Sequence, residues 1–317
     1  MPVTTPTPST PSHAILPEAY TRLARWAIWL IPLLWAVNYF VARKAPGVIE
    51  PYTLAFMRWG IAGLLLSIHA RAELRREWRN IAAVWYQYTA LGFCGMVVCG
   101  AWVYLGAQST GAVNISLIYS ASPVLIAVGS VLWLQERMRG PQVLGVVLAL
   151  TGVLHVIVKG EWTALGQVRF VVGDAWIVAA MASWAMYALL QKLWPSTLGP
   201  AARLAATCWG AMPVLLAGTV WEMAQPGTPD LTLHAWVLGL SVALLPGLGA
   251  YWIYGWAQKI LGASKVAVTL YLGPLYGALL AWLVLGESLG WHHLVAAALI
   301  LPGVFLVSGA GAVKRAE

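Results

Sequence analysis

Charged side chains are scarce in this 317-residue chain. Lys, Arg, Asp and Glu make up 9% of its residues, whereas soluble globular domains carry about 25%. Hydrophobic residues make up 60%, and the mean hydropathy is +0.75. These values exclude an ordinary soluble domain and indicate a membrane protein.

Cysteine is also rare. The three cysteines, Cys94, Cys99 and Cys208, lie within apolar stretches, and an odd number in such places argues against a disulfide framework. Cys94 and Cys99 lack the spacing and the histidine partners of a metal site. We expect them to be small packing residues, and we expect neither a metal nor another cofactor.

Motifs of known catalytic chemistry are missing. The sequence has no H-E-x-x-H, no G-x-S-x-G, no P-loop and no glycine-rich dinucleotide fingerprint. His292-His293 lies at the start of the last apolar stretch, where interfacial histidines are ordinary. No apolar stretch carries the deep nucleophile and base, or the paired carboxylates, of an intramembrane enzyme. We therefore expect no enzyme.

What the sequence does contain is a series of apolar windows about 20 residues long. At 1.5 Å per residue, about 20 helical residues cross a hydrocarbon core of about 30 Å. The sequence predicts an all-α membrane protein with ten transmembrane helices. The windows are residues 23–42, 52–70, 82–105, 112–134, 142–158, 173–192, 202–221, 235–257, 265–285 and 291–309.

The two halves of the chain resemble each other. The segment from Trp102 to Gln108 recurs from Trp252 to Gln258, an offset of 150 residues, and further matches follow at an offset of 151, such as Glu136 with Glu287. We predict two five-helix repeats, 22–160 and 171–311. Because five crossings reverse the direction of the chain, the second repeat is expected to be inverted, with a central cavity for substrate near the midplane.

Positive charges predict the orientation. With a cytoplasmic N-terminus, fourteen Lys and Arg residues fall on the inside and four on the outside, with Arg58 left within a helix. Both termini are therefore predicted to be cytoplasmic, and residues 1–21, rich in Thr, Pro and Ser, to form a disordered cytoplasmic tail. The inside set is Arg22, Arg25, Arg71, Arg75, Arg76, Arg79, Arg137, Arg139, Lys192, Arg203, Lys259, Lys265, Lys314 and Arg315; the outside set is Arg43, Lys44, Lys159 and Arg169. Basicity thus reports orientation, and no nucleic-acid partner is expected.

Polar side chains within the windows are mostly uncharged or aromatic. Such residues can line a cavity for a small amphipathic solute, because rings supply contact area and amides or hydroxyls bind polar groups. The alternative is that they pack helices or form interfacial belts. The substrate-binding candidates are Trp35, Asn38, Arg58, Trp102, Tyr104, Gln108, Ser116, Tyr119, Ser120, Trp184, Tyr187, Tyr251, Trp252, Tyr254, Gln258 and Tyr276.

Ionisable residues inside a membrane are candidates for function. Arg58 could bind a substrate carboxylate or extend toward the headgroups. Asp174 and Glu222 lie near helix ends, where we expect water to reach them. No carboxylate in the middle of a window suggests proton coupling, and the energy source stays open. Pro123 and Pro274, at equivalent places in the two halves, are candidate hinges or sites of static curvature.

Loose motifs spread over residues 22–310 resemble the EamA type of the drug/metabolite transporter superfamily. They include Trp35-Ala-Val-Asn38, Phe56-Met-Arg58-Trp59, Gly111-Ala112, Leu134-Gln-Glu136-Arg137 and Leu285-Gly-Glu287. The resemblance implies ten helices in two repeats and export of small metabolites, often amino acids, and a structurally known member type is an aromatic amino-acid exporter. The superfamily's four-helix drug pumps carry a glutamate in their first helix; residues 23–42 contain none, which counts against lipophilic-cation antiport.

Together these features predict a multi-pass transporter of a bacterial-type inner membrane that exports amino acids, aromatic ones favoured, by alternating access. Its expected partners are the small-molecule substrate and the lipid bilayer, while the oligomeric state stays open. The alternatives are export of other amino acids or of drugs, and a non-transporting membrane scaffold or sensor. A sensor would usually carry a soluble input domain, and the sequence shows none.

Overall fold

The computed structural model describes residues 18–135, 140–164, 171–261 and 273–309. Within these ranges the chain is helical and contains no strand. Seven helical stretches are long and apolar enough to cross a membrane, and three further apolar helices are shorter. The prediction of an all-α, multi-pass membrane protein is confirmed, whereas ten complete crossings and the inversion stay predictions.

Several of the stretches consist of consecutive helical elements. In chain order the elements are α1 Glu18–Ala27, α2 Leu30–Lys44, α3 Pro51–His69, α4 Arg71–Arg76, α5 Trp78–Ala83, α6 Trp85–Gly92, η1 Phe93–Ala101, α7 Trp102–Ala107, α8 Ala112–Ser120, α9 Ser122–Leu134, α10 Gly140–Ile157, η2 Trp162–Ala164, α11 Val172–Leu193, α12 Pro200–Met223, α13 Leu233–Val242, η3 Ala243–Gly249, α14 Ala250–Leu261, α16 Gly273–Leu285 and α17 Trp291–Gly309. The shorter apolar stretches lie within α10, α16 and α17.

Helix boundaries follow from local chemistry. Pro51 and Pro200 open α3 and α12, where proline's fixed φ suits the helix and its missing N–H leaves no bond unmade. The Thr232 hydroxyl caps α13 by accepting from the backbone N–H of Ala235 at 3.3 Å. Gly286, with φ of 67°, lies in the left-handed region directly after α16.

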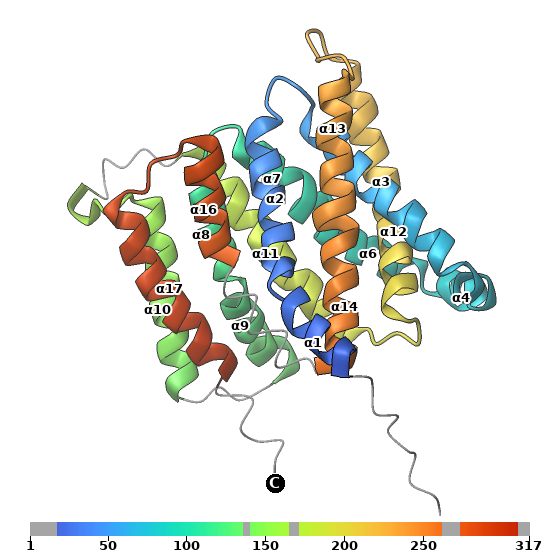
Figure 1. Ribbon diagram of the computed structural model, residues 1–317, viewed down its shortest axis with the longest axis horizontal. Coiled ribbons are helices and arrows are strands. Elements are labelled where there is room, and N and C mark those ends of the chain that lie inside the picture. The colour runs from blue at the N-terminus through green and yellow to red at the C-terminus, as the bar shows by residue number, and fades with distance from the viewer. Residues whose placement is uncertain (1–17, 136–139, 165–170, 262–272, 310–317) are drawn as a thin grey trace, which may run out of the picture.

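The upper face of the bundle, at the top of Figure 1, carries the α2–α3 and α12–α13 connections, and the lower face carries α1 and α4. Cations whose positions are described divide unequally between the faces. The lower-face set is Arg22, Arg25, Arg71, Arg75, Arg76, Arg79, Lys192 and Arg203; the upper-face set is Arg43, Lys44 and Lys159. The rest of the predicted charge pattern, such as Arg137 and Lys265, lies outside the described residues, as do residues 1–17 of the predicted tail; Glu18 already begins α1.

The starts of α3 and α12 are each capped by a carboxylate, one at the upper face from α12 and one at the lower face from α4. At the upper face Glu222, in the last turn of α12, accepts hydrogen bonds from the backbone N–H groups of Tyr52 and Thr53, both at 2.8 Å, and from the Thr53 hydroxyl at 3.0 Å. At the lower face Glu73, just beyond α3, accepts from the N–H of Gly199, just before α12, at 2.6 Å. Each carboxylate thereby satisfies donors that a helix start leaves unpaired and lies at the positive end of the helix dipole.

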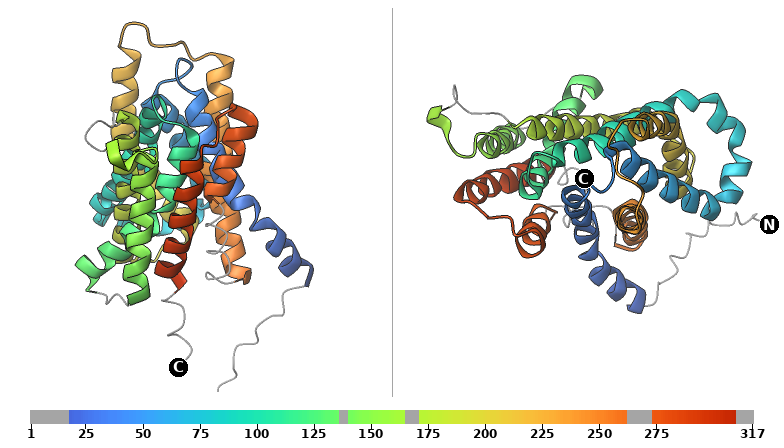
Figure 2. Two further views of the ribbon diagram at one scale, coloured as in Figure 1. Left: turned by 90° about the vertical axis from the view of Figure 1, so that its left-hand side faces the viewer. Right: turned by 90° about the horizontal axis from the view of Figure 1, so that it is seen from above.

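Contacts between the two halves occur in matching pairs. Helix α2 packs against α16 and α11 against α9, while α3 packs against η3 and α12 against η1. Helices α10 and α17 run side by side at the end of the bundle away from α4 (Figures 1 and 2). Each helix of these pairs has its sequence counterpart in the matching pair, as an approximate twofold relation between the repeats requires.

The α10–α17 contact depends on two glycines that are equivalent in the repeat. A Cβ at Gly152 would lie 3.0 Å from the Ala296 carbonyl oxygen, and one at Gly303 would lie 2.7 Å from the Gly145 carbonyl oxygen. Small residues of this kind let membrane helices approach closely. The two glycines therefore serve the same packing purpose from opposite helices.

The outer surface of the bundle is apolar. Leu132, Leu233 and Leu294 are 72%, 81% and 68% exposed, which suits lipid chains and would not suit water. Polar groups are instead found inside. Asp174 and Glu222, for which we expected solvation, are 2% and 5% exposed; that expectation is wrong, because neighbouring helix ends cover both carboxylates.

Two π-helical segments occupy equivalent places in the halves. The segment η1 begins at Phe93 and η3 at Ala243, the same offset of 150 residues that relates Trp102 to Trp252. A π-helix is wider than an α-helix and is frequent at functional sites. Both segments pack against α3, so the centre of α3 lies between two widened helices.

Candidate functional site

The centre of the bundle holds a hydrogen-bonded cluster made by three helices. Arg58 of α3 donates from one terminal nitrogen to Asn38 Oδ1 of α2 at 2.8 Å and to the Tyr104 hydroxyl of α7 at 3.3 Å. The Tyr104 hydroxyl also donates to Asn38 Oδ1, at 2.9 Å. The three side chains are 7%, 8% and 1% exposed. Arg58 is the eighth residue of α3, which places it about 10 Å along that helix.

Hydrogen-bond donors outnumber acceptors in this cluster. Arg58 Nε and the neighbouring Trp59 Nε1 are buried and have no hydrogen-bond partner in the described part of the chain. The guanidinium carbon lies 4.4 Å from the Trp59 ring centroid, a cation–π contact. Among the described residues, no carboxylate forms an ion pair with Arg58. The site therefore presents a positive charge and free donors without a matching anion.

Aromatic rings extend the cluster on one side. The ring of Trp35 on α2 lies 5.8 Å from that of Tyr251 and 5.9 Å from that of Tyr254, both on α14. The Tyr251 ring is in turn 6.4 Å from that of Trp59. We call Asn38, Arg58, Trp59 and Tyr104, together with Trp35, Tyr251 and Tyr254, the central cluster.

The π-helical segments bring the backbone close to the cluster. A Cβ at Gly100 of η1 would lie 3.0 Å from Trp59 Nε1, and one at Gly247 of η3 would lie 3.7 Å from Cγ of Arg58. The missing Cβ at Gly100 leaves room for the Trp59 ring, whereas a Cβ at Gly247 would make only an ordinary van der Waals contact with Arg58. The sequence equivalence of η1 and η3 thus becomes a spatial relation, because one segment borders each residue of the Arg58–Trp59 pair.

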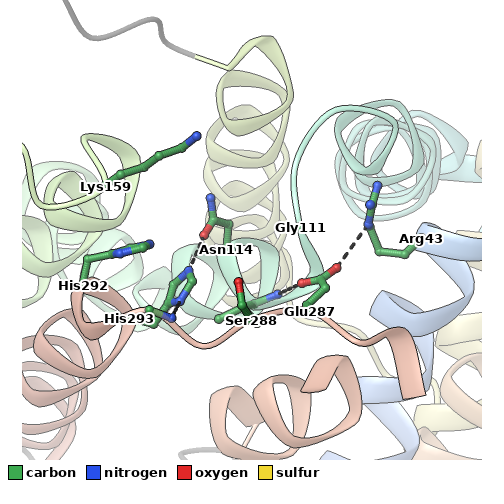
Figure 3. Close-up of a pocket in the computed structure, with 10 residues that line it drawn as sticks. Arg43, Gly111, Asn114, Lys159, Glu287, Ser288, His292 and His293 are labelled. Atoms are coloured by element: carbon green, nitrogen blue, oxygen red, sulfur yellow. Dashed lines mark hydrogen bonds and ion pairs between the residues drawn. The ribbon is translucent and has the colours of Figure 1, made fainter. Parts of the chain in front are cut away.

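A second polar site lies at the upper face (Figure 3). Glu287 accepts hydrogen bonds from the N–H groups of Ala112 and Val113, at 3.0 and 3.3 Å, and forms an ion pair with Arg43 at 3.3 Å. Arg43 also donates to the Ala107 carbonyl oxygen at 2.6 Å. Glu287 thereby joins α2 to the start of α8. Beside it is a cavity of about 420 Å³, the upper-face pocket, lined by Arg43, Gly111, Val113, Asn114, Lys159, Glu287, Ser288, Gly290, His292 and His293.

Other predicted site residues make contacts elsewhere in the bundle. Trp184 and Tyr187 stack at 5.2 Å between centroids, and Trp102 is 5.0 Å from Trp176. Trp252 is 48% exposed and meets His69 at 4.5 Å. These residues are not joined to Arg58 by a direct hydrogen bond among the contacts that are described, and their part in substrate binding stays a prediction.

Three further predicted residues lie in α8 and α16. The Tyr119 hydroxyl is 3.3 Å from Cys99 Sγ, and its ring is 6.2 Å from that of Tyr39. Ser116 is buried and donates to the Val113 carbonyl oxygen at 2.9 Å. Tyr276 of α16 is half-buried.

Some predicted positions differ from their pattern or are not described in full. Gln108 is exposed although Tyr104, one helical turn earlier, is buried. The side chains of Ser120, Gln258, Pro123 and Pro274 lie outside the described residues. Ala121 separates α8 from α9, and Pro123 is the second residue of α9. Pro274 is likewise the second residue of α16. Hinge motion at either proline stays a prediction.

Sequence reasoning missed several parts of these sites. Trp59 is one of 19 tryptophans, and only its position after Arg58 could have distinguished it. The Arg43–Glu287 ion pair joins residues 244 apart in the chain, and no local pattern predicts it. Hydropathy carries no signal for a π-helical segment inside an apolar run.

Comparisons with known proteins agree with this architecture. The model of the EamA-like transporter family matches residues 24–158 and again residues 171–309. The chain is 24% identical to the uncharacterized transporter YyaM of Bacillus subtilis, over 86% of this chain and 89% of the relative. It is 26% identical to an uncharacterized transporter of Archaeoglobus fulgidus, over 88% and 95%, and 25% identical to a WAT1-related protein of Arabidopsis thaliana, over 89% and 82%.

A crystal structure of another protein shares the fold. It superposes with a TM-score of 0.59 at 17% identity, covering 93% of this chain and 98% of the other. The family model matches far more than half of the sequence, and the relatives are matched over nearly their whole length. The chain belongs to the EamA-like transporter family and is a multi-pass membrane transporter.

Proposed function

We propose that this transporter exports amino acids, aromatic ones favoured, by alternating access across a bacterial-type inner membrane. The observation that carries the proposal is the buried Arg58–Trp59 pair, whose positive charge and two free donors lack an acceptor among the described residues. The carboxylate of an amino acid supplies the missing charge and acceptors.

Electrostatics supports an anionic group in the substrate. Burying a charge without a partner costs several kcal/mol, and charged side chains inside membranes are rare and usually functional. A guanidinium offers parallel N–H groups that match the two oxygens of a carboxylate. Arg58 Nε is free, while one terminal nitrogen is already bonded to Asn38 and Tyr104.

Ring contacts support an aromatic side chain. Within the central cluster, the Trp35 ring lies 5.8 Å from the Tyr251 ring and 5.9 Å from the Tyr254 ring. Offset and edge-to-face ring pairs add about 0.5–1.5 kcal/mol beyond burial. This preference agrees with the predicted resemblance of the sequence to the aromatic amino-acid exporter YddG.

The matching helix contacts support alternating access through inverted repeats. When each helix is replaced by its counterpart in the other repeat, the contact α2–α16 becomes α11–α9, and the contact α3–η3 becomes α12–η1. Inverted repeats allow one half to move against the other around a site at midplane. The excess of cations on the lower face supports a cytoplasmic location for both termini.

Flux from proteoliposomes tests the proposal. Vesicles containing the purified protein are loaded with labelled Trp, Phe, Tyr, Thr and a cationic drug in turn, and efflux is measured. We expect saturable efflux of aromatic amino acids. Movement of Thr or the drug alone would replace the substrate assignment, and movement of no solute would support a scaffold.

Variants of the central cluster link the flux to Arg58. Arg58→Gln removes the charge, and Arg58→Lys keeps it without the planar fork; we expect a loss of at least about tenfold from each, about 1.4 kcal/mol. Arg79→Gln, an exposed lower-face change, is the matched control and should leave flux unchanged. Equal flux in Arg58→Gln and the control would contradict carboxylate binding by Arg58.

A further inference from the structure

Asp174 is a buried carboxylate that the central cluster does not use. It lies in the first turn of α11 and is 2% exposed. Its Oδ1 accepts from the Thr110 hydroxyl and from the Asn114 side-chain amide, the latter at 3.4 Å. Its Oδ2 is buried and has no hydrogen-bond partner in the parts of the chain that are described. One oxygen of the carboxylate is thus satisfied and the other is not.

A hydrogen-bonded chain connects Asp174 with the upper-face pocket. The N–H of Gly290 donates to His293 Nδ1 at 3.0 Å, so the neutral ring carries its proton on Nε2 and donates to Asn114 Oδ1 at 3.1 Å. The other end of the Asn114 amide donates to Asp174. His293 and Asn114 line the pocket and face each other in Figure 3. A single amide therefore separates Asp174 from the pocket.

The charged and titratable groups around this chain are few. Lys159 interacts electrostatically with Asp174 and also lines the pocket. His292 and Glu287 interact electrostatically with His293. The Arg43–Glu287 pair lines the same pocket beside the start of α8, the helix that carries Asn114. A test of pH dependence at the upper face therefore has to show which of these groups binds the proton.

We propose that Asp174 is a proton-binding site at the upper face, and that this face closes only when the carboxyl carries a proton; the second part rests on the proposed alternating access. Burial costs a carboxylic acid far less than a carboxylate. On closure one proton from pocket water binds Oδ2, forming an O–H bond and taking the side-chain charge from −1 to 0. On reopening, water returns and accepts that proton.

Infrared difference spectra between acidic and alkaline buffer test the binding site without any substrate. The full-length reconstituted protein should show a carboxylic-acid C=O band that Asp174→Asn lacks. Asp230→Asn, an exposed carboxylate on the same face, should keep it. The asparagine retains an oxygen for Thr110 and Asn114, so a structural role survives the change. An unchanged band in Asp174→Asn would overturn the proposal.

Cysteine labelling tests the effect on closure. In a background with Cys94, Cys99 and Cys208 replaced by Ala, Val113→Cys reports opening, because Val113 lines the pocket yet is 2% exposed. Ser288→Cys, exposed in the same pocket, corrects for the intrinsic reactivity of the thiol. The labelling ratio is the labelling rate of Val113→Cys divided by that of Ser288→Cys. It should fall by up to about tenfold for each pH unit by which the buffer is made more acidic, which is the limit for binding of one proton.

The remaining variants assign the response to a group. With Asp174→Asn the labelling ratio should be low and independent of pH. With His292→Gln and His293→Gln combined, the slope should persist. A slope that survives Asp174→Asn and disappears in the histidine variant would overturn the assignment. No amino acid is present in either experiment, so failure of the flux panel and failure of this site are distinguishable.

Discussion

Arg58 and Arg203 show two different uses of a partly or fully buried arginine. Arg203 donates to the carbonyl oxygens of Gln191 and Trp194, at 3.0 and 2.7 Å, and so satisfies acceptors at the end of α11. Arg58 contacts only Asn38 and Tyr104 through hydrogen bonds that are described, and these two also bond each other. The Nε atoms of both arginines are buried without a hydrogen-bond partner among the described residues. The two differ in what their terminal nitrogens bind: Arg203 satisfies carbonyl groups at a helix end, whereas Arg58 bonds two side chains that already bond each other.

Substitution by leucine should separate these uses. Arg203→Leu leaves carbonyl groups unpaired and should cost about 1–3 kcal/mol. Arg58→Leu removes an uncompensated buried charge and should leave the unfolding temperature unchanged or higher, even though flux is lost. Thermal unfolding in detergent measures both. An equal drop in the two variants would mean that Arg58 is structural.

At the scale of elements, carboxylates from distant parts of the chain cap the starts of helices. Glu222 caps α3 and Glu287 caps α8 at the upper face, and Glu73 caps α12 at the lower face. Only the α3–α12 pair is capped at both of its ends among the contacts described. Glu222 and Glu287 each accept from two N–H groups in a first helical turn, so the loss of either carboxylate leaves two N–H groups unpaired.

Glu222→Ala should therefore lower the free energy of unfolding by on the order of 2 kcal/mol. Glu222→Gln keeps one acceptor oxygen and should cost less. Glu161→Ala, an exposed carboxylate on the same face, should change stability by less than about 0.5 kcal/mol. Denaturation of the purified protein checks the order of the three, and a Glu222→Ala variant as stable as Glu161→Ala would refute the capping role.

Prediction from sequence reached different depths for different elements. The positions of the helices followed from hydropathy, because a bilayer imposes length and apolarity on each crossing. Arg58, Asn38 and Tyr104 were each candidates, but their mutual contacts depend on the packing of α2, α3 and α7. The burial of Asp174 could not be predicted, because a residue in a first helical turn can face water or a neighbouring helix with the same local sequence.

For the whole molecule, the side of the membrane that each face occupies is the property to test. In the background without native cysteines, Asp230→Cys reports the upper face and Asn80→Cys the lower face; both positions are exposed. A membrane-impermeant maleimide should label Asp230→Cys in intact cells and Asn80→Cys only after permeabilisation. The opposite result would reverse the orientation expected from the cation distribution.

The cross-capping of α3 and α12 also limits how the bundle can move. Sliding α12 along α3 by a single turn, about 5.4 Å, would separate Glu222 from Tyr52. Because α4 follows α3 after one residue, the same motion would also separate Gly199 from Glu73 of α4. Rotation about the common line of the pair strains both ends much less. We therefore expect the α3–α12 pair to stay fixed as a unit while the remaining helices rotate about it.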